Sequence, residues 1–151
     1  MKQEAIILDL DGTLCNTDHR IHHLNKTPKD WDSWNAGIMD DEINFQVKCA
    51  VYGLLQLLHT HPKKLLIVTG RFEEFRTATE SWLTRNGIVT YQLFMRKKYD
   101  FRSDTSVKEE IYHRFIEQDY DVKVVLEDRG KVVQMWRSLG LECWQVKEGD
   151  Y

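Results

Sequence analysis

The 151-residue sequence is long enough for one folded domain with a hydrophobic core of its own. Its hydrophobic content of 42% and aromatic content of 11% exclude a disordered or collagen-like chain. The net charge of -3 and the isoelectric point near 6.1 argue against a protein that coats long nucleic acid with a wholly basic face, although a local basic patch is compatible with both.

Predicted strands and helices alternate along the chain. Apolar runs typical of buried strands occupy residues 5–10, 65–70, 91–95, 122–127 and 141–146. Helical patterns lie between them at residues 44–59, 73–87, 106–118 and 131–140. This alternation predicts an α/β fold in three layers, a Rossmann-like parallel sheet between two layers of helices. Trp136 and Trp144 fall in the last helix and the last strand, and we expect both in the core.

Residues 16–42 interrupt the alternation because they are polar and only weakly periodic. A loop of this length in a compact domain is usually functional or has a small structure of its own. We therefore expect a single domain over residues 1–151 with a small cap, residues 16–42, inserted after the first strand. Trp31 and Trp34 are expected to pack this cap against the domain rather than to stack on a nucleobase, which is the alternative.

Polar residues follow three of the predicted strands at their carboxyl ends. The first strand runs into Asp9-Leu10-Asp11-Gly12-Thr13, the second into Thr69-Gly70-Arg71, and the fourth into Glu127-Asp128-Arg129. In parallel α/β sheets, ligands bind beyond the carboxyl ends of the strands. We therefore expect these groups to meet at one site.

The first of these motifs predicts phosphoryl-transfer chemistry. Asp9 is suited to attack phosphorus and form an aspartyl-phosphate. Asp11 lies two residues further on and would point to the same side in extended backbone. It could protonate the leaving oxygen and then accept a proton from the hydrolytic water. Lys108, which opens a helical pattern, could hold Asp9 and the phosphate with its positive charge.

A carboxylate does not approach an anionic phosphate readily, so this chemistry needs a hard divalent cation. Mg²⁺ prefers oxygen ligands in octahedral geometry, which suits Asp9, the Asp11 carbonyl and Asp128, with Glu127 as the further acidic residue. Gly12 would let backbone amides approach the phosphoryl oxygens. The remaining contacts to the phosphoryl group are expected from the Thr69 hydroxyl and the Gly70 amide.

Each motif is weak when taken alone. An isolated D-x-D-G can open a calcium loop or form an Asx turn, although the twelfth position of such a loop is Arg20 here and a strand precedes it. A single lysine such as Lys108 is more often a solvated helix residue. All four elements, in order and at strand ends, favour the functional interpretation.

"DLDGTL", "VTG", Lys108 and "ED" resemble the four motifs of the haloacid dehalogenase (HAD) superfamily of phosphohydrolases. The resemblance implies an HAD-like fold and the roles given above. Asp11 resembles the second aspartate of the phosphatase and phosphomutase branches, which the dehalogenases lack.

The stretch from Val107 to Tyr151 looks like the 3′-phosphatase domain of phage-type polynucleotide kinases, and the likeness extends back to Glu4. It implies substrate-binding roles for Arg20, Arg71 and Arg96. The chain departs from the family pattern at Glu127, where a second aspartate is usual, and residues 22–43 match poorly.

A basic cluster, Arg96, Lys97, Lys98 and Arg102, follows the third strand. We expect it to contact the phosphates of a strand end, and the alternative is an ordinary exposed loop.

The function expected from the residues and the resemblance is a Mg²⁺-dependent phosphomonoesterase that removes 3′-phosphates from DNA or RNA ends. A phosphatase of free nucleoside monophosphates, or of another small phosphate ester, is the alternative and shares the chemistry. A non-catalytic binding subunit is a third reading, which the intact set Asp9, Asp11, Lys108 and Asp128 disfavours.

The sequence has no G-x-x-x-x-G-K-[S/T] motif, so the kinase half of such enzymes is absent, and whether a separate kinase or ligase partner exists is left open. No apolar run approaches the roughly 20 residues that span a bilayer, and the N-terminus has no leader pattern. The three cysteines have no metal-like spacing and are expected as reduced thiols. We therefore expect a cytoplasmic protein.

Overall fold

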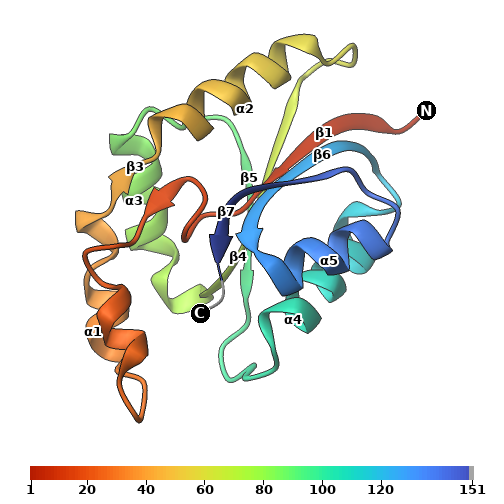
Figure 1. Cartoon of the computed structure of the whole chain (residues 1–151). Coiled ribbons are helices and arrows are strands. Elements are labelled where there is room, and N and C mark those ends of the chain that lie inside the picture. Colours follow the sequence, from red (N-terminus) through yellow and green to blue (C-terminus); the bar gives the residue numbers. More distant parts are fainter. Residues whose placement is uncertain (150–151) are drawn as a thin grey trace.

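The structure, a computed structural model, describes residues 1–149. Its central sheet has five parallel strands in the order β5-β4-β1-β6-β7 (Figure 1). These strands are β1 (Gln3–Leu8), β4 (Lys64–Phe72), β5 (Gln92–Arg96), β6 (Tyr120–Arg129) and β7 (Cys143–Gly149). The central strand β1 pairs with β4 on one side and β6 on the other, so that Ile7 lies between Leu66 and Val125. The predicted α/β fold is confirmed.

Helices cover both faces of the sheet (Figure 1). One face packs against α2 (Phe45–Leu57) and α3 (Arg76–Arg85), which follows the short η3 (Glu73–Phe75). The other packs against α4 (Asp104–Ile111), its π-helical continuation η4 (Tyr112–Ile116), and α5 (Gly130–Ser138). Successive residues of β1 alternate between the two cores: Ile6 and Leu8 lie with Trp82, whereas Ala5 and Ile7 lie with Trp136.

Residues 16–42 form a short excursion beyond the carboxyl end of β1. It contains η1 (Ile21–Asn25), α1 (Trp31–Ala36) and η2 (Ile38–Asp40), and it leaves and returns through the antiparallel pair β2 (Cys15–Asn16) and β3 (Glu42–Ile43). Trp34 is buried, with the Arg20 guanidinium 3.9 Å from its ring centroid, whereas Trp31 is exposed. Trp34 therefore packs inside the excursion, against Arg20, whereas the exposed Trp31 does not pack as expected.

The edge strands β7 and β5 are less buried than the central strand β1. On β7, Cys143 is buried but Trp144 is 44% exposed, and its indole N–H donates to Glu142 (2.9 Å). The expectation that Trp144 is a core residue is wrong: side chains of β7 alternate between the faces of the sheet, and Cys143 faces the core beside α5 while Trp144 points to the other face, where it is not part of a core. Trp136 is fully buried as expected. On the opposite edge, Phe94 of β5 stacks on Phe115 with their ring centroids 6.0 Å apart.

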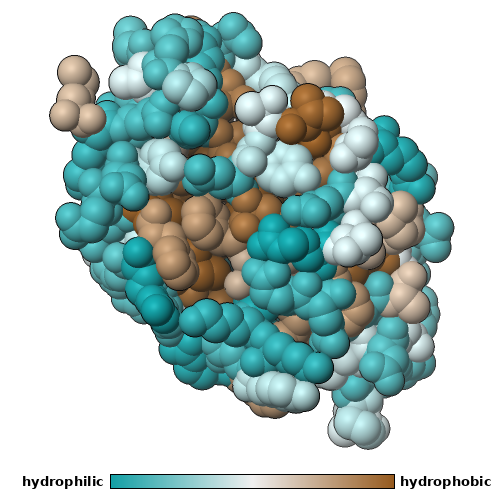
Figure 2. All heavy atoms as spheres, turned by 180° about the vertical axis from the view of Figure 1, so that it is seen from behind, coloured by the Kyte–Doolittle hydropathy of each residue, from teal (hydrophilic) through white to brown (hydrophobic). Residues whose placement is uncertain are grey.

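Seen from behind, the surface is largely hydrophilic and has an apolar hollow near its middle (Figure 2). Among residues 1–149, no helix has both the length and the apolar character needed to cross a bilayer.

Leu8→Ala should lower the free energy of unfolding by about 2–5 kcal/mol, because it leaves a cavity in the fully buried core beside α2. The matched control is Leu57→Ala, since Leu57 is 73% exposed and its truncation removes little buried surface. Urea denaturation of both variants measures the difference. Equal losses would contradict the described packing.

Candidate active site

The carboxyl ends of β1, β4 and β6 converge, as the sequence predicted for polar groups at strand ends. Asp9 directly follows β1, and its backbone N–H donates to the Leu126 carbonyl of β6 (3.1 Å). Glu127 and Asp128 belong to β6, while Thr69 and Gly70 belong to β4. Side chains from three neighbouring strands therefore share one end of the sheet.

Lys108 of α4 reaches this end of the sheet and is almost completely buried. Its Nζ donates to Asp9 Oδ1 and to Glu127 Oε2, each at 2.8 Å, and lies 3.4 Å from Asp104 Oδ2. Burial alone would lower the pKa of Lys108, but the carboxylates of Asp104, Asp9 and Glu127 raise it well above its usual value. The ammonium therefore stays charged and fixes one oxygen of Asp9.

Asp9, Glu127 and Asp128 form an acidic cluster in which one carboxylate oxygen of each residue lies within 4.8 Å of the other two. Burial, together with the negative charge of Glu127, raises the pKa of Asp9 to about 8, although Lys108 acts in the opposite direction. Burial also raises the pKa of Glu127. Added positive charge would keep these groups ionised, and hard oxygen donors are the ligands that Mg²⁺ prefers. The residues present therefore fit a divalent cation.

Thr13 joins this cluster, although the sequence motif had given it no role. Its hydroxyl lies 3.1 Å from Asp9 Oδ2 and 3.3 Å from Asp128 Oδ1. The turn that brings it there contains Gly12, whose φ of +83° is in the left-handed region that favours glycine. The Gly12 N–H donates to the Cys15 carbonyl (3.0 Å). The position of Thr13 in the first motif, four residues after Asp9, was the sequence signal that could have identified it.

The Asp11 carboxylate belongs to a second ionic cluster. It accepts hydrogen bonds from Arg20 Nη2 (2.6 Å) and from Arg71 Nη2 (2.6 Å) and Nε (3.0 Å). Burial would raise the pKa of Asp11, but the Arg71 and Arg20 guanidiniums hold it well below its usual range. Asp11 is therefore ionised in this arrangement, and it must exchange part of this pairing before it can carry a proton.

Asp41 completes the second cluster and was missed by the sequence reasoning. Its fully buried carboxylate accepts from Arg20 Nε and Nη2, both at 2.6 Å, and from Arg71 Nη2 at 3.2 Å. Its backbone carbonyl accepts from the Trp82 indole (2.8 Å), which anchors the end of the 16–42 excursion to α3. Nothing in the polar pattern around residue 41 distinguishes this aspartate from the exposed Asp40.

Thr69 contacts Arg71 of the second cluster, whereas Gly70 and Arg96 lie against Asp104, which contacts Lys108. The buried Thr69 hydroxyl accepts from the Arg71 backbone N–H (3.2 Å). A side chain on Gly70 would collide with Asp104, so the β4 backbone approaches this carboxylate closely. Arg96 donates from Nε to the Gly70 carbonyl (2.9 Å), and its Nη2 lies 3.5 Å from Asp104. The predicted substrate residue Arg96 is thus held among protein groups.

A pocket of about 300 Å³ opens beside the acidic cluster. Gly12 and Asp128 line it together with residues of η1 and the end of β7. The Lys147–Asp18 ion pair (3.1 Å) spans the two sides. Asp128 therefore forms part of the wall of this pocket.

A family model described as the polynucleotide kinase PNKP phosphatase domain matches residues 3–151. The chain belongs to this family of HAD-type phosphatase domains. The resemblance identified from the four motifs is therefore confirmed.

Known relatives are longer than this chain. A putative bifunctional polynucleotide kinase/RNA ligase of Autographa californica nuclear polyhedrosis virus is 29% identical over 137 residues, which cover 89% of this chain and 18% of the viral protein. A chain in the structure of the Pnkp1/Rnl/Hen1 RNA repair complex is 31% identical, with a TM-score of 0.84 over 99% of this chain and 44% of that one. A second Pnkp1/Rnl/Hen1 structure gives 32% identity and a TM-score of 0.81, over 99% of this chain and 48% of that one.

Asp41→Asn should destabilise the fold, because Arg20 and Arg71 would lose a buried counter-charge. Removal of one partner from a buried ion pair usually costs about 3–5 kcal/mol. Asp40→Asn is the matched control, since this neighbouring aspartate is exposed and should cost almost nothing. Denaturation curves of the two variants make the comparison, and an Asp41→Asn variant as stable as its control would refute the described network.

Proposed function

We propose that this domain is a Mg²⁺-dependent phosphomonoesterase that removes 3′-phosphates from polynucleotide ends through an aspartyl-phosphate intermediate. The observation that supports it most strongly is the buried Lys108–Asp9 pair beside Glu127 and Asp128, at the carboxyl ends of the strands. Membership of the polynucleotide kinase phosphatase family supports the substrate class.

The carboxylates of Asp9, Asp128 and Glu127 and the Asp11 carbonyl would hold the Mg²⁺. When bound, the ion neutralises carboxylate and phosphate charge, so that an anionic ester can approach Asp9. Glu127 has a second task, since its Oε1 accepts from the backbone N–H groups of Asp128 (3.1 Å) and Arg129 (3.3 Å). These bonds orient the end of β6.

The chain's own groups divide the reaction into two displacements. An Asp9 carboxylate oxygen attacks phosphorus, the bond between phosphorus and the 3′-oxygen breaks, and Asp11 delivers a proton to that oxygen. Water then attacks the aspartyl-phosphate, Asp11 accepts its proton, and Asp9 is regenerated with release of phosphate. Lys108 fixes the Asp9 oxygen that it contacts throughout.

Arg20 and Arg71 connect substrate binding to the protonation of Asp11. Both guanidiniums contact Asp11 in the structure, and an incoming phosphoryl group competes for them. As they turn to the phosphate, burial and the negative charge of the phosphate raise the pKa of Asp11, which allows it to carry a proton. The Thr69 hydroxyl and the Gly70 amide supply further phosphoryl contacts in this proposal, and the turn at Gly12 brings the backbone close to the phosphoryl group.

Residues 16–42 act as a small cap in a single-domain enzyme, and its brevity suits a polymer end that must reach Asp9 without being enclosed. The alternative, a phosphatase of free nucleoside monophosphates or other small esters, uses the same residues. The pocket of about 300 Å³ beside Asp128 favours it, because that volume suits a small ligand. Since the solved relatives belong to an RNA repair complex, a separate kinase or ligase partner also fits the proposal.

Phosphate release from four substrates separates these functions: a 3′-phosphorylated oligonucleotide, a 5′-phosphorylated one, and free 3′- and 5′-mononucleotides, each with Mg²⁺ present or chelated. We expect the 3′-phosphorylated oligonucleotide to react fastest, and chelation to stop the reaction. Asp9→Asn is the control and should lose turnover while its circular dichroism spectrum is unchanged.

Faster release from free mononucleotides than from the oligonucleotide would favour the alternative function. Undiminished turnover after chelation would overturn the role of Mg²⁺. Near-normal activity in Asp9→Asn would show that another group is the nucleophile.

A further inference from the structure

We propose that the loop between β5 and α4, residues 97–102, is a stacking platform for the nucleobases next to the 3′-phosphate of a single-stranded polynucleotide. This inference rests on the proposed function and adds a binding surface to it. We call these six residues the β5–α4 loop.

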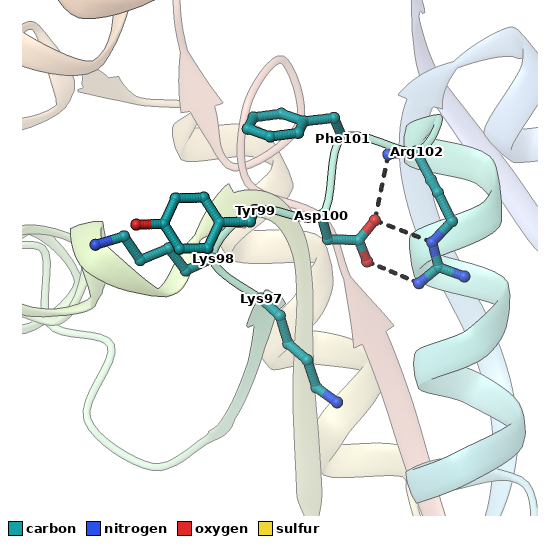
Figure 3. A pocket seen from close by; sticks show the side chains of 6 residues that line it. All are labelled: Lys97, Lys98, Tyr99, Asp100, Phe101 and Arg102. Carbon is teal, nitrogen blue, oxygen red and sulfur yellow. Dashed lines mark hydrogen bonds and ion pairs between the residues drawn. The ribbon is translucent and has the colours of Figure 1, made fainter.

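Two aromatic rings of this loop face solvent. Tyr99 is 74% exposed and Phe101 is 81% exposed, and the loop lines an open hollow of about 610 Å³. Both rings project from the same side of the loop, while Asp100 and Arg102 point to the other side (Figure 3). Exposed aromatic faces beside positive charge are what proteins use to bind single strands, because every base has a face that can stack.

The charge of the loop matches a polynucleotide. Lys97 and Lys98 are both exposed, and the Lys98 Nζ lies 5.0 Å from the centroid of the Tyr99 ring. Arg102, in contrast, is paired with Asp100 (2.7 Å) and Glu110 (2.6 Å), so its charge is compensated within the protein. Of the predicted basic cluster, the two lysines therefore offer positive charge beside the rings.

The β5–α4 loop is held in one shape. Arg96 Nη1 donates to the carbonyls of Asp100 (3.0 Å) and Arg102 (2.6 Å), which clamps the loop from inside. Tyr99 has a φ of +65°, an uncommon conformation for a bulky residue. Phe101 packs edge-on against Phe72 of β4, with ring centroids 5.9 Å apart. A rigid platform loses little entropy when a base stacks on it.

The same clamp connects the loop to the reaction centre. Arg96 also contacts the Gly70 carbonyl and Asp104, Asp104 lies 3.4 Å from Lys108, and Lys108 contacts Asp9. The loop lies at the carboxyl end of the sheet (Figure 1). A strand whose 3′-phosphate is at Asp9 can therefore extend its neighbouring bases toward Tyr99 and Phe101.

Two variants each remove one ring and are chosen to keep the conformation of the loop. Tyr99→Asn keeps a residue that tolerates positive φ, and Phe101→Leu keeps an apolar contact with Phe72. We expect each to raise the KM for a 3′-phosphorylated oligonucleotide about fivefold or more, the lower end of what one stacked base contributes. The kcat/KM for a small chromogenic phosphate ester should not change.

Conservative variants and a distant aromatic residue complete the experiment. Tyr99→Phe and Phe101→Tyr retain a stacking face and should keep the wild-type KM. Trp144→Ala removes an exposed ring from the opposite edge of the sheet and should have no effect. In the inactive Asp9→Asn protein, a 2-aminopurine placed next to the 3′-phosphate should be quenched on binding, and the quenching should decrease in Tyr99→Asn or Phe101→Leu.

The possible failures are distinguishable. A wild-type protein that releases no phosphate from the oligonucleotide would overturn the proposed function, and the inference with it. A wild-type protein that is active, with an unchanged oligonucleotide KM in both ring-removing variants, would overturn the stacking platform alone. Equal losses on the oligonucleotide and the small ester would also overturn it, because the rings would then act through the fold of the catalytic site.

Discussion

A buried ammonium between carboxylates is the interaction on which the rest of this molecule depends. Lys108 contacts Asp9 and Glu127 at 2.8 Å each while almost inaccessible to water. Charges in such surroundings are stable only when they are paired, and removal of Lys108 would leave the buried carboxylates of Asp9 and Glu127 without a counter-charge. The sheet order that sets β1 beside β6, and the packing of α4 against their shared face, therefore serve to bring these three side chains together.

The two aspartates of the first motif, although only two residues apart, lie in opposite electrostatic environments. Burial and Glu127 raise the pKa of Asp9, whereas Arg71 and Arg20 lower that of Asp11 against the effect of burial. A nucleophilic carboxylate must be ionised and a general acid must be protonated, so without ligands both pKa shifts have the wrong direction for the proposed roles. A cation beside Asp9 would lower the pKa of Asp9, and a phosphate that draws the arginines away from Asp11 would raise the pKa of Asp11. In the proposed mechanism the substrate and the metal thus complete the site electrostatically.

The sequence predicted most of the fold because hydrophobic alternation and strand-end motifs are local signals. Asp9, Thr69 and Asp128 stand directly after or within apolar runs, and Lys108 could be recognised by its family position. Asp41 gave no such signal, since its importance comes from contacts with Arg20 and Arg71 that only the folded excursion creates. Trp144 was misplaced for a related reason: an apolar run does not reveal that its strand lies at the edge of the sheet.

The central claim is that Asp9, Glu127 and Asp128 form a cation site beside Lys108, and the most direct test is the melting temperature measured as Mg²⁺ is titrated. An ion that binds only the folded state raises the melting temperature with its concentration. We expect this rise in the wild-type protein and little or none in Asp128→Asn, each compared with its own metal-free value. An equal rise in both proteins would contradict the claim.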